Sequence, residues 1–129
     1  MEVTSHDERR LKLELRLAQL EKNETCQKQF LSFVKTIWPS FIQGRHHEII
    51  AEKLERVARG ELKRLIINMA PRHTKSEFAS FLFPAWMMGK NPNMKIIQAT
   101  HTTELAVNFG RKVKNLLDTD EFREVFPDV

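Results

Sequence analysis

The chain has 129 residues, of which 41% are hydrophobic and 29% are charged. This length fits one domain of the usual size, roughly 100 to 200 residues, and the composition excludes a disordered or fibrous protein. Lysine and arginine exceed aspartate and glutamate by 21 to 17, a net charge of +4. So small an excess does not by itself indicate a nucleic-acid-binding protein.

The single cysteine, Cys26, excludes an internal disulfide and a cysteine-based zinc site. The first residues are charged rather than apolar, and the sequence has no run of about 18 apolar residues. We therefore expect a cytoplasmic protein that is neither secreted nor inserted in a membrane.

The first part of the chain is predicted to be helical. Ser5 and Glu8 have the spacing of a capping box, and no glycine or proline occurs from there to Ile37. Asn23 or Thr25 is the expected cap of a second helix. The apolar residues of that helix recur at helical spacing and are expected to pack on another helix: Phe30, Phe33, Val34 and Ile37.

The middle of the chain predicts a strand, a helix and a second strand. A third helix over residues 46–59 ends at Gly60, a position that suits a left-handed residue. Short apolar runs over 64–69 and 95–99 are typical of buried strands. The helix between them covers 75–88, with Gly89 as its stop and a kink at Pro84. This βαβ order implies a parallel sheet.

The last part of the chain predicts two more helical elements. Thr102 or Thr103 is expected to cap a helix that continues to Leu117. One further turn or two should follow, because Phe122 and Val125 are apolar residues at helical spacing.

The most informative stretch is A-P-R-H-T-K-S, over residues 70–76, between the first predicted strand and the helix that follows it. A helix start offers unpaired N–H groups to a phosphate. Lys75 can add a charge for the phosphates, and the Ser76 hydroxyl can coordinate Mg²⁺. Arg72 can stabilise the charge that develops on the γ-phosphate during transfer.

The common P-loop pattern G-x-x-x-x-G-K-[ST] is only half met, because Met69 and Thr74 occupy the two glycine positions. A second interpretation therefore stays open, in which Thr74 caps the helix and Lys75 is a solvated surface residue.

Residues 64–77, R-L-I-I-N-M-A-P-R-H-T-K-S-E, closely resemble the glycine-poor Walker A segment of the large terminase subunits of tailed phages and prophages. The resemblance continues upstream over 41–64. Downstream it includes I-I-Q-A-T-H-T-T-E-L-A from Ile96, F-G-R-K-V-K-N-L-L from Phe109 and E-F-R-E-V-F-P-D from Glu121. The order and spacing of these blocks make the resemblance more specific than any one motif.

The resemblance implies an α/β fold, namely the parallel sheet of the RecA-like, additional-strand P-loop class. Residues 1–60 would form a helical amino-terminal segment, and 61–129 the first part of the ATPase domain. The implied function is ATP- and Mg²⁺-dependent packaging of double-stranded DNA into procapsids in the host cytoplasm. The implied partners are the portal protein, the small terminase subunit and further copies of the chain in a ring.

The resemblance also implies roles for individual residues. Arg72 and Lys75 match the family's catalytic Walker A residues, and Ser76 matches its Mg²⁺ ligand. Gln43 matches an upstream glutamine that contacts adenine, although we favour the interpretation that it is an ordinary exposed loop glutamine. The implied nucleotide-binding set is Gln43, Pro71, Arg72, His73, Thr74, Lys75, Ser76 and Glu77.

A Walker B strand ending in an Asp-Glu pair is not recognisable in this sequence. The nearest candidate is L-L-D-T-D-E over residues 116–121, which has two apolar residues and follows a helical pattern, so we expect a solvated turn there. The family's nuclease residues are not recognisable either, and we expect a fragment of a larger motor, whose own ATPase activity stays uncertain. Two alternatives remain: a helicase-like DNA translocase fragment, and a non-catalytic protein that binds DNA or a packaging partner.

Overall fold

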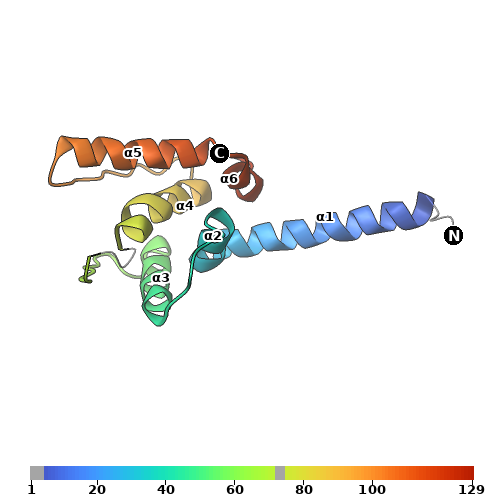
Figure 1. Cartoon of the computed structure of the whole chain (residues 1–129), viewed down its shortest axis with the longest axis horizontal. Helices are drawn as coiled ribbons and strands as arrows, with labels where there is room; N and C mark the ends of the chain where they lie inside the picture. Colours follow the sequence, from blue (N-terminus) through green and yellow to red (C-terminus); the bar gives the residue numbers. More distant parts are fainter. Residues whose placement is uncertain (1–4, 72–74) are drawn as a thin grey trace.

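The computed structural model describes residues 5–71 and 75–129 of the chain. A long amino-terminal helix projects from a smaller body built of shorter helices and extended connections (Figure 1). The elements in chain order are α1 (Ser5–Lys28), α2 (Phe30–Ile37), α3 (Arg45–Ala58), the π-helical segment η1 (Glu77–Leu82), α4 (Phe83–Lys90), α5 (Thr103–Leu117) and α6 (Asp120–Val125).

The boundary between the first two helices differs from the prediction. The α1 helix runs through both proposed caps: Thr25 Oγ1 donates to the Glu21 carbonyl at 3.0 Å, and Asn23 Nδ2 donates to the Glu124 carbonyl at 2.9 Å. The break comes at Gln29, which is extended at φ −118° and ψ 118°. Asn23 therefore joins α1 to the far end of the chain instead of starting a helix.

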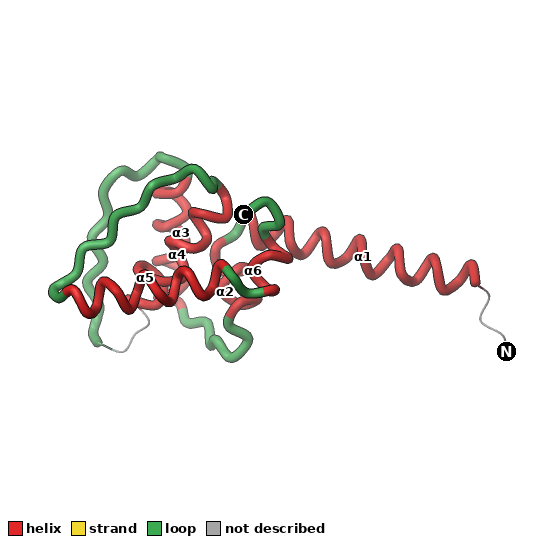
Figure 2. Tube along the Cα trace, turned by 90° about the horizontal axis from the view of Figure 1, so that it is seen from above, coloured by secondary structure: helices red, strands yellow, loops and turns green. Residues whose placement is uncertain are grey.

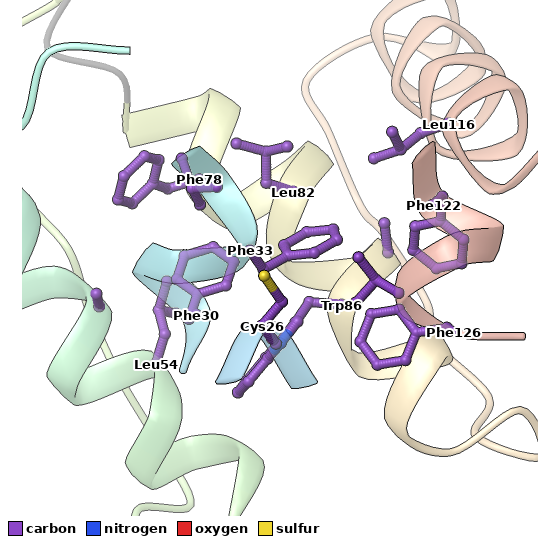
Figure 3. Close-up of a cluster of buried hydrophobic side chains, with 14 of the residues drawn as sticks. Cys26, Phe30, Phe33, Leu54, Phe78, Leu82, Trp86, Leu116, Phe122 and Phe126 are labelled. Atoms are coloured by element: carbon purple, nitrogen blue, oxygen red, sulfur yellow. The ribbon is translucent and has the colours of Figure 1, made fainter. Parts of the chain in front are cut away.

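The core is organised around two aromatic side chains of α2, as Figure 3 shows. Phe30 meets Phe78 edge-on at a centroid distance of 5.4 Å and also contacts Trp86 at 5.4 Å. Phe33 packs against Phe122 at 6.0 Å and Phe126 at 5.9 Å. All six rings are buried. The prediction that the apolar stripe of α2 packs on other helices is thus confirmed.

A buried hydrogen bond fixes α4 to the end of α1. The fully buried indole Nε1 of Trp86 donates to the Cys26 carbonyl at 2.9 Å. A carbonyl near a helix end has no helical partner and needs another donor. Trp86 supplies that donor and also fills the centre of the core.

Most helix ends follow local sequence signals. Gly60 follows α3 with φ +77°, which a residue with a side chain adopts only at a cost. The Thr102 hydroxyl accepts from the Leu105 N–H at 3.2 Å and caps α5. Thr119 caps α6 in the same way, accepting from the Phe122 N–H at 3.3 Å. The helices expected over 46–59, over 103–117 and around Phe122 are confirmed.

The helix between the two expected strands is present but differs in detail from the prediction. Lys75 and Ser76 are helical, and η1 and α4 continue the helix to Lys90. Pro84 lies in the first turn of α4, where the chain changes from π-helical to α-helical bonding. Gly89 is inside the helix, so its predicted role as the stop is wrong.

The predicted parallel sheet is wrong as well. Over residues 5–71 and 75–129 the chain forms no β-strand, and no backbone hydrogen bond joins 64–69 to 95–99. Both segments are extended, but each packs separately on helices. Figure 1 shows the second running along α5 and the first lying near α3, while Figure 2 shows both as loops. A sheet needs strands about 4.8 Å apart with paired backbones, so the described chain has a helical fold.

Each extended segment nevertheless alternates between buried and exposed side chains. In the first, Leu65 and Ile67 pack against the core, whereas Ile66 is 85% exposed. In the second, Ile97 is 94% exposed, and the neighbouring Gln98 donates from Nε2 to the Ser80 carbonyl at 2.6 Å. The strand-like pattern of the sequence therefore reflects real one-sided packing without strand pairing.

Candidate functional site

The candidate site comprises Lys75 and Ser76, which are the first helical residues described after residue 71. The segment before it is extended up to Ala70, and Ser76 has helical torsions, φ −69° and ψ −36°. Lys75 is half-buried and Ser76 is exposed. A serine hydroxyl is an oxygen ligand of the kind that Mg²⁺ accepts, and a lysine ammonium is a cation that can bind phosphate.

Three predicted residues, Arg72, His73 and Thr74, lie outside the described residues. Pro71, immediately before them, is exposed and lies in a turn. The roles predicted for these four positions stay predictions.

The structure brings a distant part of the chain to this helix. Phe78 is two residues after Ser76, and its ring lies 5.5 Å from that of Phe41 and 5.2 Å from that of His47. Phe78 is fully buried by these contacts and by Phe30. The loop that carries Gln43 is therefore attached to the same helical turn that carries the lysine and the serine.

Gln43 itself is engaged within that loop region. Its Nε2 donates to Glu48 Oε1, on the first turn of α3, at 2.7 Å. This hydrogen bond fixes the amide group and leaves its oxygen as the atom available to a ligand. The structure thus places Gln43 near the Phe41 contact and adds Glu48 as its partner, which the sequence did not indicate.

Glu77 borders a mostly apolar cavity. The cavity has a volume of about 630 Å³ and is also lined by Trp38, Phe81 and Lys112. The cavity lies between α2, η1 and α5, and most of its walls are apolar. Sequence reasoning missed this cavity because its walls come from three separate helices.

His47 is a structural residue of the site. It is 5% exposed, its Nδ1 accepts the Gly44 N–H at 2.8 Å, and its ring packs edge-on against Phe41 at 4.7 Å. The imidazole therefore closes the first turn of α3 and holds the Gln43 loop against Phe78. Nothing in the sequence distinguishes it from the adjacent His46.

The acidic residues after α5 form the solvated turn that was expected. Asp118 is exposed at the end of α5 and lies 3.4 Å from Arg123, and Asp120 begins α6. No metal-binding group of three or more His, Cys, Asp or Glu side chains occurs in the described parts of the chain. These acids thus serve the helix-to-helix turn.

Comparison with models of protein families, with curated proteins and with solved structures found no match to this chain. None of the helices within 5–71 and 75–129 combines the length and the apolar character that crossing a membrane requires.

Proposed function

We propose that this chain carries the nucleotide-binding segment of a DNA-packaging ATPase similar to large terminase subunits. In this role Lys75 binds the β- and γ-phosphates of ATP, Ser76 coordinates the accompanying Mg²⁺, and Arg72 stabilises charge on the transferred phosphoryl group. The complete motor would use ATP to drive double-stranded DNA through a portal into a procapsid, with a small terminase subunit and further copies of the chain as partners.

The observation that supports the proposal is that Lys75 and Ser76 are the first residues of a helix that the structure describes after residue 71. The backbone N–H groups and the positive end of the helix dipole at a helix start stabilise a phosphate without any neighbouring strand. The contact of Phe78 with Phe41 adds the second element, because it brings the Gln43 loop to the same turn. Phe78, three residues after Lys75, therefore lies beside the loop that carries Gln43.

A fluorescent ATP analogue with Mg²⁺, titrated against the full chain, tests the proposal. We expect Lys75→Ala to weaken binding by about tenfold or more, since a charged hydrogen bond contributes about 1.5–3 kcal/mol. Lys63→Ala is the matched control, because Lys63 is an exposed lysine of the preceding segment and its removal changes the net charge equally. Ser76→Ala should reduce the gain in affinity that Mg²⁺ provides.

Equal affinities for Lys75→Ala and Lys63→Ala would contradict the phosphate site. A chain that binds no nucleotide, and whose thermal unfolding is the same with and without Mg-ATP, would support the non-catalytic alternative instead.

A further inference from the structure

Most of α1 lies outside the body with its side chains exposed. The helix packs on the body only near its end, through the buried side chains of Asn23 and Cys26. Before them, residues 5–22 project from the body, as Figures 1 and 2 both show. At 1.5 Å per residue this part is about 27 Å long, and its side chains are exposed apart from the half-buried Gln19.

One face of this projecting helix carries a short leucine seam. Leu13, Leu17 and Leu20 follow one another at spacings of four and three residues, which are the spacings of the d, a and d positions of a coiled coil. Their exposed fractions are 71%, 58% and 48%. Leucines at these spacings lie along one side of the helix, and covering them would remove apolar surface from water.

The charges beside this seam differ in sign on its two flanks. Arg9 and Arg16 occupy the g positions on one side, and Glu14 and Glu21 occupy the e positions on the other. Among the described residues, no ion pair involves Arg9, Arg16 or Glu21, whereas Glu14 pairs with Arg10 at 3.1 Å within the exposed helix. One flank of the seam is therefore basic and the other acidic.

We propose that α1 binds a second copy of the chain as a parallel, in-register, two-stranded coiled coil through Leu13, Leu17 and Leu20. In a parallel pair, a g residue faces the e residue five positions later in the second helix. This rule pairs Arg9 with Glu14 of the second copy and Arg16 with Glu21 of the second copy. An antiparallel pair would bring basic flank to basic flank and acidic to acidic, which the charges disfavour.

The opposite face of α1 has less of this complementarity. Its apolar residues, Leu11, Leu15 and Ala18, have the same spacing. The corresponding rule pairs Asp7 with Lys12, which are opposite in charge, but Glu14 with the uncharged Gln19, so this face offers one complementary pair where the Leu13 face offers two. We therefore assign the interface to the Leu13 face and use the Leu15 face as a control.

Charge reversal tests the proposal in the full chain, with sedimentation equilibrium over a concentration series as the measurement. Arg16→Glu places like charges at two symmetric contacts and should raise the dimer dissociation constant by about tenfold, or ~1.4 kcal/mol. Adding Glu21→Arg to Arg16→Glu recreates opposite charges and should restore dimerisation. Lys12→Glu makes the same charge change outside the seam and should have little effect.

Two outcomes would overturn the coiled coil: a wild-type chain that stays monomeric throughout the series, or a Lys12→Glu variant that dissociates as readily as Arg16→Glu. Leucine substitutions check the seam independently of charge. Leu17→Ala should weaken the dimer, while Leu15→Ala, on the opposite face, should leave it unchanged.

Orientation is tested by oxidation of His6→Cys, a d position near the outer end of the helix. A parallel, in-register pair brings the two introduced thiols together and yields a disulfide-linked dimer. The native Cys26 is 1% exposed and does not compete. Leu15→Cys is the control and should not crosslink. A dimer that forms without crosslinking through position 6 would contradict the parallel arrangement.

Discussion

Gln98 donates from Nε2 to the Ser80 carbonyl oxygen at 2.6 Å. In a regular α-helix that carbonyl would accept from the N–H of residue 84, but residue 84 is a proline and has no N–H. The second extended segment thus supplies this carbonyl with a side-chain donor. The bond joins the segment to η1.

We expect Gln98→Ala to destabilise the fold by about 1–2 kcal/mol, because it removes the donor from a partly buried carbonyl. Urea unfolding followed by circular dichroism measures the effect. Ile97→Ala is the control: Ile97 is 94% exposed, and its truncation should change the unfolding free energy by less than about 0.5 kcal/mol. Equal losses for the two variants would show that the bond to Ser80 has no role in stability.

Gly89 packs so closely that no larger residue fits. A Cβ at this position would lie 2.5 Å from the ring of Phe126, which is buried at 4% exposure. Gly89→Ala should therefore cost about 1–3 kcal/mol, although alanine is the better helix former. Gly110→Ala is the matched variant, since a Cβ on that glycine of α5 meets nothing within 4 Å. It should stabilise the chain by up to about 1 kcal/mol.

Thermal or urea unfolding should show that Gly89→Ala lowers the free energy of unfolding and that Gly110→Ala raises it. If both variants raise it, Gly89 and Phe126 are not in close contact in solution.

Arg59 and Glu61 form an exposed pair beyond the end of α3. Arg59 Nε lies 2.9 Å from Glu61 Oε1, and this hydrogen bond lowers the pKa of the Glu61 carboxyl. A lowered folded-state pKa means that the pair's stabilising effect is present above the unfolded-state pKa and is lost as the pH falls through the folded-state value. NMR titration of the glutamate carboxyls should show Glu61 titrating at lower pH in the native chain than in Arg59→Gln.

Glu24 provides the internal reference for this titration. A hydrogen bond from Lys28 lowers its pKa, and Lys28 is unaffected by the change at position 59. A Glu61 titration that does not move in Arg59→Gln would show that the pair does not persist in solution.

Local signals in the sequence predicted several helices correctly and failed for the sheet. The cap at Thr102 and the spacing of Phe30 and Phe33 depend on neighbours in the chain, and both agree with the structure. The apolar runs over 64–69 and 95–99 do adopt extended backbones. Whether two extended segments pair depends on tertiary packing, which periodicity does not specify. Gly89 was misjudged for the same reason, because Phe126 is far away in sequence.

For the candidate site too, the sequence predicted the local helix and not the contacts between distant segments. A lysine and a serine before an apolar helical pattern predict a helix start, and Lys75 and Ser76 are helical. The contact of Phe78 with Phe41 and the cavity beside Glu77 join residues from separate helices. No spacing in the sequence encodes such contacts.

The two extended segments also bear on the solubility of the chain. Each exposes an isoleucine, Ile66 or Ile97, on a backbone that pairs with no strand in the parts of the chain that the structure describes. Such edges are where chains aggregate, and flanking charges oppose this. Lys63 and Arg64 precede the first segment and Lys95 lies within the second. Salt screens this repulsion, so we expect concentrated solutions of the chain to aggregate less at low ionic strength than at high ionic strength.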